Sequence, residues 1–240
     1  MSLARRALAE FAGSAALVAV VVGSGTMAAD LSRDAGVRLL ANSLATAAGL
    51  AVLIVILAPV SGAHFNPVVS VAAWVLTRRD AAPAVRGREV AAYVPAQTAG
   101  AVSGAVLANA MFGLPAVQLS AHDRSAPHLL LGEVVATAGL VVVVFALARQ
   151  GRAALAPVAV GGYIGAAYWF TSSTSFANPA VTLGRAFTDT FAGIAPASVP
   201  GFIVAQLAGA ALGGLLLVML YPGSPRAGAE PVPGSAYQPR

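Results

Sequence analysis

Residues Ser175 to Phe187 read SFANPAVTLGRAF, and a second Asn-Pro pair lies upstream in SGAHFNPVVSVAAWVL, from Ser61 to Leu76. Each pair is followed by an apolar stretch that is too short to cross a bilayer. The stretch from Pro67 to Thr77 has 11 residues, which as a helix is about 16 Å, roughly half of a bilayer core. Such pieces are tolerated at membrane depth where protein buries them or where they line a wet cavity. We therefore predict two re-entrant half-helices, the second beginning after Pro179.

The composition supports a membrane protein with no cysteine chemistry. Of the 240 residues 58% are hydrophobic and 10% are charged, and the mean hydropathy is +0.80. Soluble domains carry roughly a quarter charged residues. The chain has no Cys, so disulfides and thiolate ligands are excluded. Its net charge of +5 comes from scattered Arg residues without a basic stripe, so we expect no nucleic-acid partner.

Six apolar stretches are long enough to span a core of about 30 Å. They run approximately from Ala7 to Ala28, Val37 to Ala58, Val90 to Phe112, Leu129 to Ala148, Ala153 to Phe170, and Val199 to Leu220. A signal peptide is an alternative for the first, although Glu10 interrupts its apolar run. The prediction is an all-α membrane protein with one channel domain over residues 1–221, followed by a disordered cytoplasmic tail over residues 222–240.

The distribution of Arg predicts the orientation. With the N-terminus inside, the inner side holds ten Arg residues: Arg5, Arg6, Arg78, Arg79, Arg86, Arg88, Arg149, Arg152, Arg226 and Arg240. The outer side holds four: Arg33, Arg38, Arg124 and Arg185. This excess of positive charge, together with six spans, predicts a multi-pass protein of the cell membrane with both termini in the cytoplasm.

The chain contains an internal repeat, over about residues 5–112 and 128–221. The order of polar residues is the same in both halves: Glu10, Asn66 and Gln97 in the first, and Glu133, Asn178 and Gln206 in the second. Each half has three spans, an odd number, so the second half is inverted relative to the first. Paired interruptions in inverted halves indicate a binding site or passage near the midplane.

The residues at the start of each half-helix suit a passage for neutral solutes. Asn66 and Asn178 are good N-cap residues, and Pro67 and Pro179 suit the first helical position. Each helix start carries the positive end of a helix dipole, equivalent to roughly half a charge. Two such ends at the midplane repel cations, while the Asn amides can donate hydrogen bonds into a lumen.

At these residues the sequence resembles the major intrinsic protein family, the aquaporins and aquaglyceroporins. The resemblance rests on SGAHFNP, ANPA, an AEF near the start and two AQ-x-AG-A segments, and covers about residues 5 to 221. It implies six membrane helices with two half-helices, one pore per subunit and a homotetramer. No second ligand is spaced with His64, so we expect no metal, and we expect no cofactor. The short match NPAVTLGRAFTDTF further resembles a bacterial branch associated with arsenic resistance.

The resemblance assigns roles to the two Asn-Pro boxes and to three polar residues. Asn66, Pro67 and Val68 form one box, and Asn178, Pro179 and Ala180 form the other. Val68 departs from the family's usual Ala, and two interpretations stay open: a packing variant where the two tips touch, or an effect on selectivity. Glu10, Glu133 and His64 are expected to brace the re-entrant loops; a proton relay is the alternative for the two carboxylates.

The resemblance also implies an outer selectivity filter of four positions, which we assign to Ala48, Ala166, Ser175 and Val181. Val181 stands where the family has an Arg. Because an Arg presents five donors and a permanent charge, its replacement by small residues predicts a wider and less polar lumen. Arg185 lies one helical turn after Val181. We expect its charge either to reach the outer vestibule, or to pair with Asp189 or the interface.

We therefore predict a passive channel for small neutral solutes such as glycerol, urea or uncharged metalloid acids, together with water and within a lipid bilayer. The first alternative is a water-selective channel. Less favoured alternatives are a coupled secondary transporter and a closed structural protein. The sequence has no nucleophile with a base partner and no phosphate-binding loop, so we predict that the protein is not an enzyme.

Overall fold

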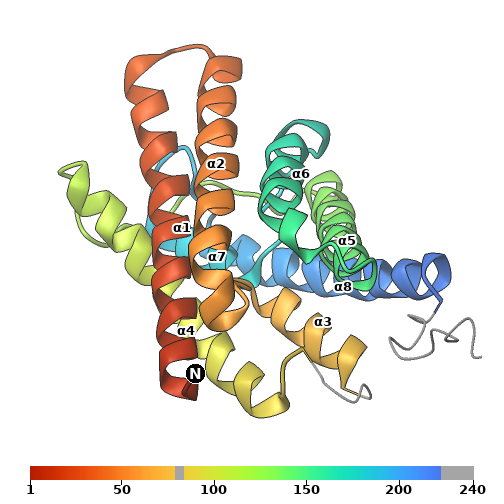
Figure 1. The fold of residues 1–240 in the computed structure, drawn as a ribbon. Coiled ribbons are helices and arrows are strands. Elements are labelled where there is room, and N and C mark those ends of the chain that lie inside the picture. The colour runs from red at the N-terminus through yellow and green to blue at the C-terminus, as the bar shows by residue number, and fades with distance from the viewer. Residues whose placement is uncertain (79–83, 223–240) are drawn as a thin grey trace, which may run out of the picture.

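The computed structural model describes residues 1–78 and 84–222, and within these ranges the regular structure is entirely helical (Figure 1). The long helices are α1 (Leu3–Leu31), α2 (Ala35–Ser61), α4 (Gly87–Met111), α5 (Pro127–Arg149), α6 (Ala156–Phe170) and α8 (Val199–Leu220). The short ones are α3 (Pro67–Thr77), α7 (Pro179–Gly184), and the 3₁₀ turns η1 (Ala153–Leu155), η2 (Arg185–Phe187) and η3 (Pro196–Ser198).

Six helical segments are long and apolar enough to cross a membrane, which confirms the predicted spans. Counting the adjoining 3₁₀ turns, they contain 18 to 29 residues. Their outward faces carry many exposed aliphatic side chains, such as Val52 and Leu216. This pattern is expected of helices that contact lipid on one side. The predicted tail, residues 222–240, lies outside the described residues except for Pro222.

Both predicted half-helices form, and both begin at the predicted Asn. The Asn66 and Asn178 side chains cap α3 and α7, and the following Pro occupies the first turn. The first half-helix has the expected 11 residues, but the second is shorter. After the 6 residues of α7 the chain tightens into η2, where Gly184 packs so closely on the Ala101 backbone that an added Cβ would lie 2.7 Å from it.

The two halves repeat the same packing scheme, in agreement with the predicted inverted repeat. Helices α1 and α2 lie side by side (Figure 1), as their counterparts α5 and α6 also do. The first helix of each half packs on the last, α1 on α4 and α5 on α8. Each half-helix contacts both α4 and α8, so the two short helices are held between the halves.

Small residues allow the long helices to pack closely, which is the usual mode in membranes. A Cβ added at Gly100 would lie 2.2 Å from the carbonyl oxygen of Phe11, and one at Gly209 would lie 2.4 Å from that of Val134.

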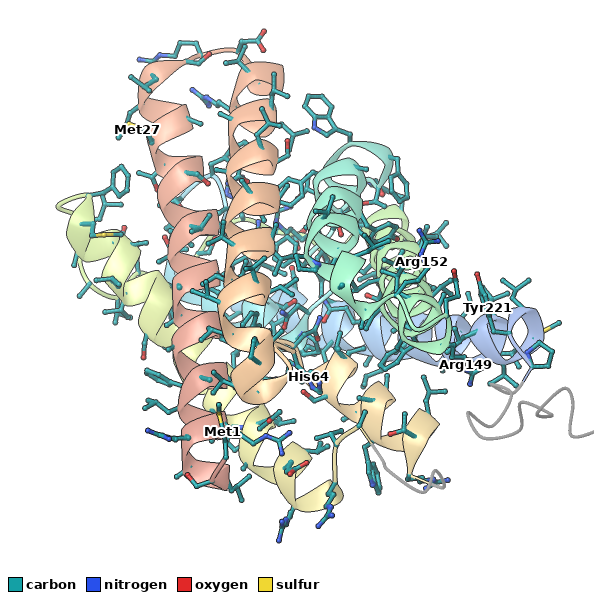
Figure 2. The ribbon with its side chains drawn as sticks, viewed as in Figure 1. Met1, Met27, His64, Arg149, Arg152 and Tyr221 are labelled. Atoms are coloured by element: carbon teal, nitrogen blue, oxygen red, sulfur yellow. The ribbon has the colours of Figure 1, made fainter. Side chains whose placement is uncertain are left out.

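At the ends of α5 and α8, Arg149 lies near Tyr221 (Figure 2) and donates a hydrogen bond to its carbonyl oxygen.

Candidate functional site

The two Asn residues join the half-helices to each other. The Asn66 Nδ2 group donates a hydrogen bond to the Ala177 carbonyl (2.7 Å), and the Asn178 Nδ2 group donates one to the Phe65 carbonyl (2.8 Å). Each Asn thus caps its own helix with Oδ1 and binds the opposite loop with one amide hydrogen. Because a primary amide has two hydrogens, one on each Asn remains for a ligand in the adjoining cavity.

The carboxylate of Glu10 holds the first re-entrant loop. Its oxygens accept hydrogen bonds from the backbone N–H groups of His64 (3.0 Å) and Phe65 (2.7 Å), from the Ser61 hydroxyl (2.6 Å) and from the Gln97 amide (2.7 Å). The side chain of Glu10 is fully buried. This is the geometry that a loop-bracing carboxylate requires, with the charge distributed over four donors.

Glu133 holds the second loop in the same way. It accepts hydrogen bonds from the backbone N–H groups of Phe176 (2.9 Å) and Ala177 (2.8 Å) and from the Gln206 amide (2.6 Å). It is also fully buried. The repeated Glu and Gln residues therefore occupy equivalent places in the two halves.

His64 lines the cavity that is described in the next paragraph, and Val68 does not. The Nδ1 atom of His64 is 3.0 Å from the Ser70 hydroxyl on α3, and its ring contacts the edge of Tyr93. His64 also lines the cavity described next, whereas Val68 is buried and does not line it. His64 is thus placed both to brace the loop and to contact a solute.

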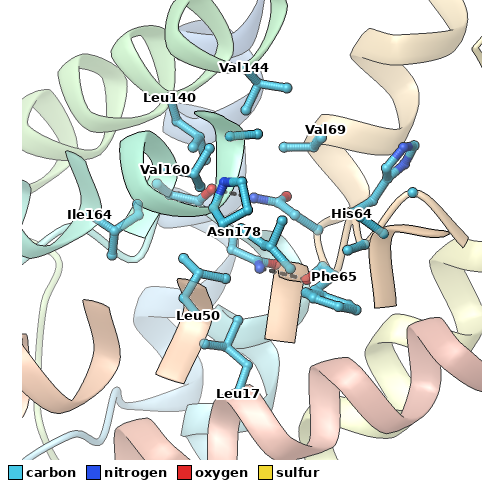
Figure 3. Close-up of a pocket in the computed structure, with 18 of the residues that line it drawn as sticks. Leu17, Leu50, His64, Phe65, Val69, Leu140, Val144, Val160, Ile164 and Asn178 are labelled. Atoms are coloured by element: carbon cyan, nitrogen blue, oxygen red, sulfur yellow. Dashed lines mark hydrogen bonds between the residues drawn. The ribbon is translucent and has the colours of Figure 1, made fainter. Parts of the chain in front are cut away.

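A cavity of about 600 Å³ is lined by both Asn residues, by the turn between α5 and α6 and by the start of α7. Figure 3 draws part of its lining. Asn66, Asn178 and His64 contribute polar groups to its wall. Aliphatic side chains form most of the rest: Leu17, Val21, Leu50, Ile54, Val69, Leu140, Val144, Val160 and Ile164. Among the described residues that line it there is no carboxylate, so none of these side chains brings a negative charge to the cavity wall.

Two of the four predicted filter residues line this cavity. Val181 is 4% exposed and follows the second Asn-Pro-Ala box at the start of α7. Ser175 is 3% exposed and has a positive φ of 51°, and its hydroxyl has no hydrogen-bond partner among the described residues. A buried hydroxyl without a partner is costly, so Ser175 adds to the cavity wall a polar group that the described protein leaves unsatisfied.

The other two predicted filter residues, Ala48 and Ala166, are placed elsewhere. Both are exposed on the outer faces of their helices and neither lines the cavity, so this part of the prediction was wrong. The polar residues of α2 and α6 that line it are instead Thr46 and Tyr168. Each lies two positions from the predicted one, and two residues turn a helix by about 200°.

Thr46 and Tyr168 could have been found from the pattern of the spans. Thr46 begins a stripe with Leu50 and Ile54 at a spacing of four residues, and Tyr168 ends a similar stripe with Ile164. Residues four apart share a helix face, so a polar side chain in register with a buried stripe faces the protein interior. The hydroxyls of Thr46 and Tyr168 are 3.2 Å apart.

Arg185 also lines the cavity, and its guanidinium lies over the ring of Phe176 at 3.4 Å from the centroid. Its Nε donates a hydrogen bond to the Ala192 carbonyl, and the side chain is 2% exposed. Asp189 instead accepts a hydrogen bond from the backbone N–H of Ala121. Within the described part of the chain Arg185 forms no ion pair, so its charge faces the cavity without a carboxylate partner.

The loop before α5 adds a second cation to the same aromatic ring. The Arg124 guanidinium is 5.1 Å from the Phe176 centroid. Next to it, the Asp123 carboxylate accepts hydrogen bonds from the hydroxyls of Ser125 (2.6 Å) and Ser198 (2.9 Å). These bonds lower the pKa of Asp123, because they stabilise its charged form.

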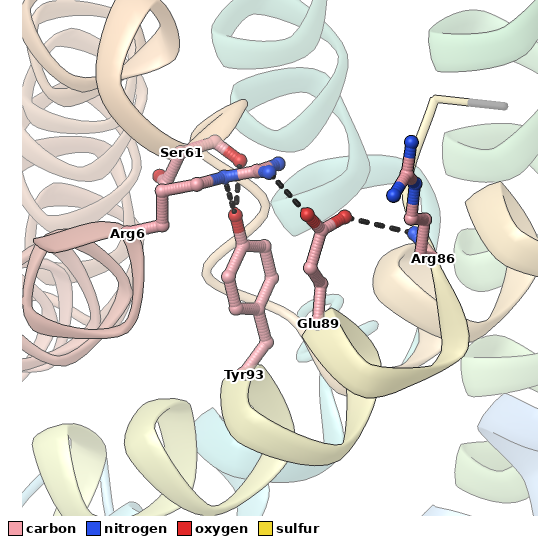
Figure 4. Close-up of polar contacts among 5 residues, drawn as sticks. All are labelled: Arg6, Ser61, Arg86, Glu89 and Tyr93. Carbon is pink, nitrogen blue, oxygen red and sulfur yellow. Dashed lines mark hydrogen bonds and ion pairs between the residues drawn. The ribbon is translucent and has the colours of Figure 1, made fainter. Parts of the chain in front are cut away.

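A polar network beside the first re-entrant loop, outside the lining of the cavity, was not predicted from the sequence (Figure 4). Arg6 donates hydrogen bonds to the Tyr93 hydroxyl (2.8 Å) and to Glu89 (2.5 Å). The Tyr93 hydroxyl donates to the Ser61 carbonyl (2.8 Å), and Glu89 accepts from the backbone N–H of Arg86. The network joins the starts of α1 and α4 to the end of α2, directly before the first re-entrant loop.

Comparisons with known proteins agree with this geometry. The Major intrinsic protein family matches residues 1–176. The chain is 52% identical to the aquaglyceroporin AqpS of Rhizobium meliloti, over 87% of this chain and 86% of the relative. It is 32% identical to a glycerol uptake facilitator protein of Pseudomonas aeruginosa, over 88% and 87% of the two chains.

The fold is also that of a solved channel. The structure of the aquaglyceroporin from Plasmodium falciparum superimposes with a TM-score of 0.69, covering 92% of this chain and 96% of that one at 19% identity. The similar sequences and the similar fold therefore indicate the same family as the capped half-helices and the repeated Glu and Gln residues do. The chain belongs to the major intrinsic protein family.

Proposed function

We propose that the protein is a passive channel that conducts small neutral solutes, with water, across a membrane. The observation that carries this proposal is the meeting of two Asn-capped half-helices at one cavity. Their aligned N-terminal ends disfavour cations, and Asn66 and Asn178 each retain an amide hydrogen for a neutral acceptor. Glycerol is the solute we expect first, as the names of the aquaglyceroporin and glycerol uptake facilitator relatives suggest, and urea is a second neutral solute that we expect.

The outer selectivity filter is proposed to contain Ser175 and Val181, with Arg185 as a displaced charge. Val181 leaves this level of the cavity without the donors that an Arg would supply. The Arg185 guanidinium stacks on Phe176 in the same cavity, close enough to repel a passing cation. Such a filter favours solutes larger than water, including uncharged metalloid acids, over a water-only pore.

The assembly and orientation are part of the same proposal. We infer a homotetramer with one pore per subunit, in the cell membrane, with both termini in the cytoplasm. The excess of Arg on the side of the N-terminus supports this orientation. In each subunit, we propose a single channel domain over residues 1–221. It contains both Asn-Pro boxes and both braced loops.

The test is solute permeability in liposomes that contain the purified full-length protein. Wild-type protein is expected to conduct water, urea and glycerol down a gradient, and Val181→Arg is expected to retain water conduction while glycerol permeability falls about tenfold or more. Val181→Leu is the matched control, because it adds volume without a charge or donors. A wild-type protein that conducts only water would support the water-selective alternative, and uptake driven by a proton gradient would support a coupled transporter.

A further inference from the structure

One face of the first half-helix, α3, is not covered by the rest of the described chain. Four residues with the spacing i, i+3, i+4 and i+7 share this face: Val71, Trp74, Val75 and Arg78. Val71 is 37% exposed and Val75 is 46% exposed, whereas other sides of α3 pack on α4 and α8. We propose that this face binds one anionic phospholipid, with an acyl chain along the two Val residues and the phosphate at Arg78 and Arg88.

The face extends from the interior of the membrane to the edge of its hydrocarbon core. Helix α3 begins after Asn66, where the two half-helices meet, and inverted repeats place such a meeting point near the midplane. The helix then rises by about 16 Å, roughly half of a bilayer core. Arg78, the residue directly after the helix, therefore lies at the level of lipid headgroups. Aliphatic and aromatic side chains come first along this face and a cation comes last, which matches a phospholipid from its acyl chain to its phosphate.

The Trp74 ring contacts both the end of α3 and the start of α4, which lie at the same end of the molecule (Figure 1). The Arg78 guanidinium is 5.7 Å from the centroid of this ring. A Cβ added at Gly87 would lie 3.7 Å from the Trp74 Nε1 atom, and Arg88 is the next residue. Trp is the side chain most typical of the membrane interface, because its body is apolar and its N–H is polar. Two cations are thus held beside an interfacial ring.

The cations near this ring have no carboxylate partner in the described structure. Arg78, Arg86 and Arg88 are exposed, and none of them forms an ion pair within residues 1–78 and 84–222. Glu89, the carboxylate in the first turn of α4, is paired with Arg6 instead (Figure 4). A phosphate diester supplies one negative charge and accepts hydrogen bonds from guanidinium groups. Its charge complements this cluster, and that of a zwitterionic lipid is offset by its own cation.

A lipid also suits this face better than a second copy of the chain does. A contact between subunits would have to bury the unpaired guanidinium groups of Arg78 and Arg88, and buried unpaired charges are strongly unfavourable. Charged residues are accordingly depleted at the centre of protein interfaces. A lipid headgroup instead leaves these cations at the water boundary. The aliphatic part of the face, Val71 and Val75, is narrow enough for a single acyl chain.

The chain contains its own probe for this contact. It has two Trp residues, Trp74 on the proposed face and Trp169 on α6, which is 51% exposed. Trp169→Phe leaves Trp74 as the single fluorescent Trp, and Trp74→Phe leaves Trp169. Bromine atoms on an acyl chain quench a Trp that the chain touches. The two single-Trp proteins therefore report separately on the proposed site and on lipid contacts elsewhere.

The experiment compares the quenching of Trp74 in full-length Trp169→Phe protein in liposomes of phosphatidylglycerol and phosphatidylcholine, with bromine on one lipid or the other. Phosphatidylglycerol is expected to be preferred at Trp74 about fivefold or more, because each Arg near the surface strengthens binding of anionic lipid. Adding Arg78→Gln and Arg88→Gln together should lower the preference to about one. Arg152→Gln is the matched control: it is exposed, two spans separate it from Arg88, and the preference should persist. Trp169 in Trp74→Phe protein should be quenched about equally by the two lipids.

Each other result overturns the proposal. Equal quenching of Trp74 by the two lipids would do so, as would a preference that survives the loss of both Arg78 and Arg88 or that Arg152→Gln removes equally well. Absence of quenching by either lipid would mean that protein, such as a second copy of the chain, covers the face. If inorganic phosphate at constant ionic strength abolished the preference, the cluster would be a site for free phosphate. If the double variant does not fold, Arg78→Gln and Arg88→Gln are measured singly, and an unchanged preference in both contradicts the assignment.

Discussion

At the scale of single residues, the two buried carboxylates determine the conformation of the pore loops. Glu133 accepts three hydrogen bonds, two of them from the backbone of the loop that carries Ser175. A Gln at this position has one acceptor oxygen, and its amide hydrogens would face other donors. We expect Glu133→Gln to lower the free energy of unfolding by about 2–3 kcal/mol, because a hydrogen bond to a charged group is replaced by a buried mismatch.

The measurement for Glu133→Gln is thermal unfolding of the purified protein in detergent, together with glycerol permeability. Asp30→Asn is the control, because Asp30 is an exposed carboxylate near the end of α1. We expect the control to keep the wild-type Tm. If Glu133→Gln also kept it, the bracing role argued from the acceptor geometry of Glu133 would be wrong.

At the scale of helices, close packing through glycine holds each half together. The α5–α8 contact places the Val134 carbonyl oxygen 2.4 Å from the position that a Cβ on Gly209 would occupy. We expect Gly209→Ala to destabilise the protein by about 1–3 kcal/mol, because overpacking forces the helices apart. Gly162→Ala on α6, where an added Cβ meets nothing within 4 Å, should be neutral or slightly stabilising. Equal Tm values for the two variants would contradict this account.

The helices were predictable from the sequence. The rotation of α2 and α6 about their own axes, which decides which side chains face the cavity, was not. Apolar length gave the six spans, and Asn-Pro gave both half-helix starts, because these signals are local. Ala48 and Ala166 were assigned from the family pattern by position along the chain. On a helix each residue turns the side chain by about 100°, so a shift of two residues moves it to the opposite face.

The loop before α7 explains why counting from Asn178 fails on α6. Thr174, Ser175 and Ala177 all have positive φ, so the chain there follows an irregular path that sequence spacing does not encode. Ser175 lies within this loop and close to Asn178, and it lines the cavity. For Arg185 the sequence leaves open whether its charge reaches the outer vestibule or pairs with Asp189 or the interface, because this depends on the fold of the chain after α7.

At the scale of the whole molecule, the inverted repeat makes one cavity from two equivalent halves. Equivalent residues hold each loop, yet the charged groups near the two loops differ. Near the first loop, outside the cavity lining, Arg6 is paired with Glu89. Near the second loop, the guanidinium groups of Arg185 and Arg124 both lie over the Phe176 ring, and neither forms an ion pair among the described residues. The barrier to cations is therefore expected at the end that contains Ser175 and Val181.

The orientation of the molecule gives the last prediction. Three spans, α1, α2 and α4, separate Ala4 from Ala121, and one further span separates Ala121 from Gln150. All three residues are exposed, and the chain contains no Cys, so single cysteines can be introduced without background. With the positively charged side in the cytoplasm, a membrane-impermeant maleimide added to intact cells should label Ala121→Cys and leave Ala4→Cys and Gln150→Cys unlabelled until the cells are opened. Labelling of Ala4→Cys and Ala121→Cys from the same side would contradict the odd number of spans between them, whereas the reverse pattern would keep the fold and place the Arg185 end of the cavity in the cytoplasm.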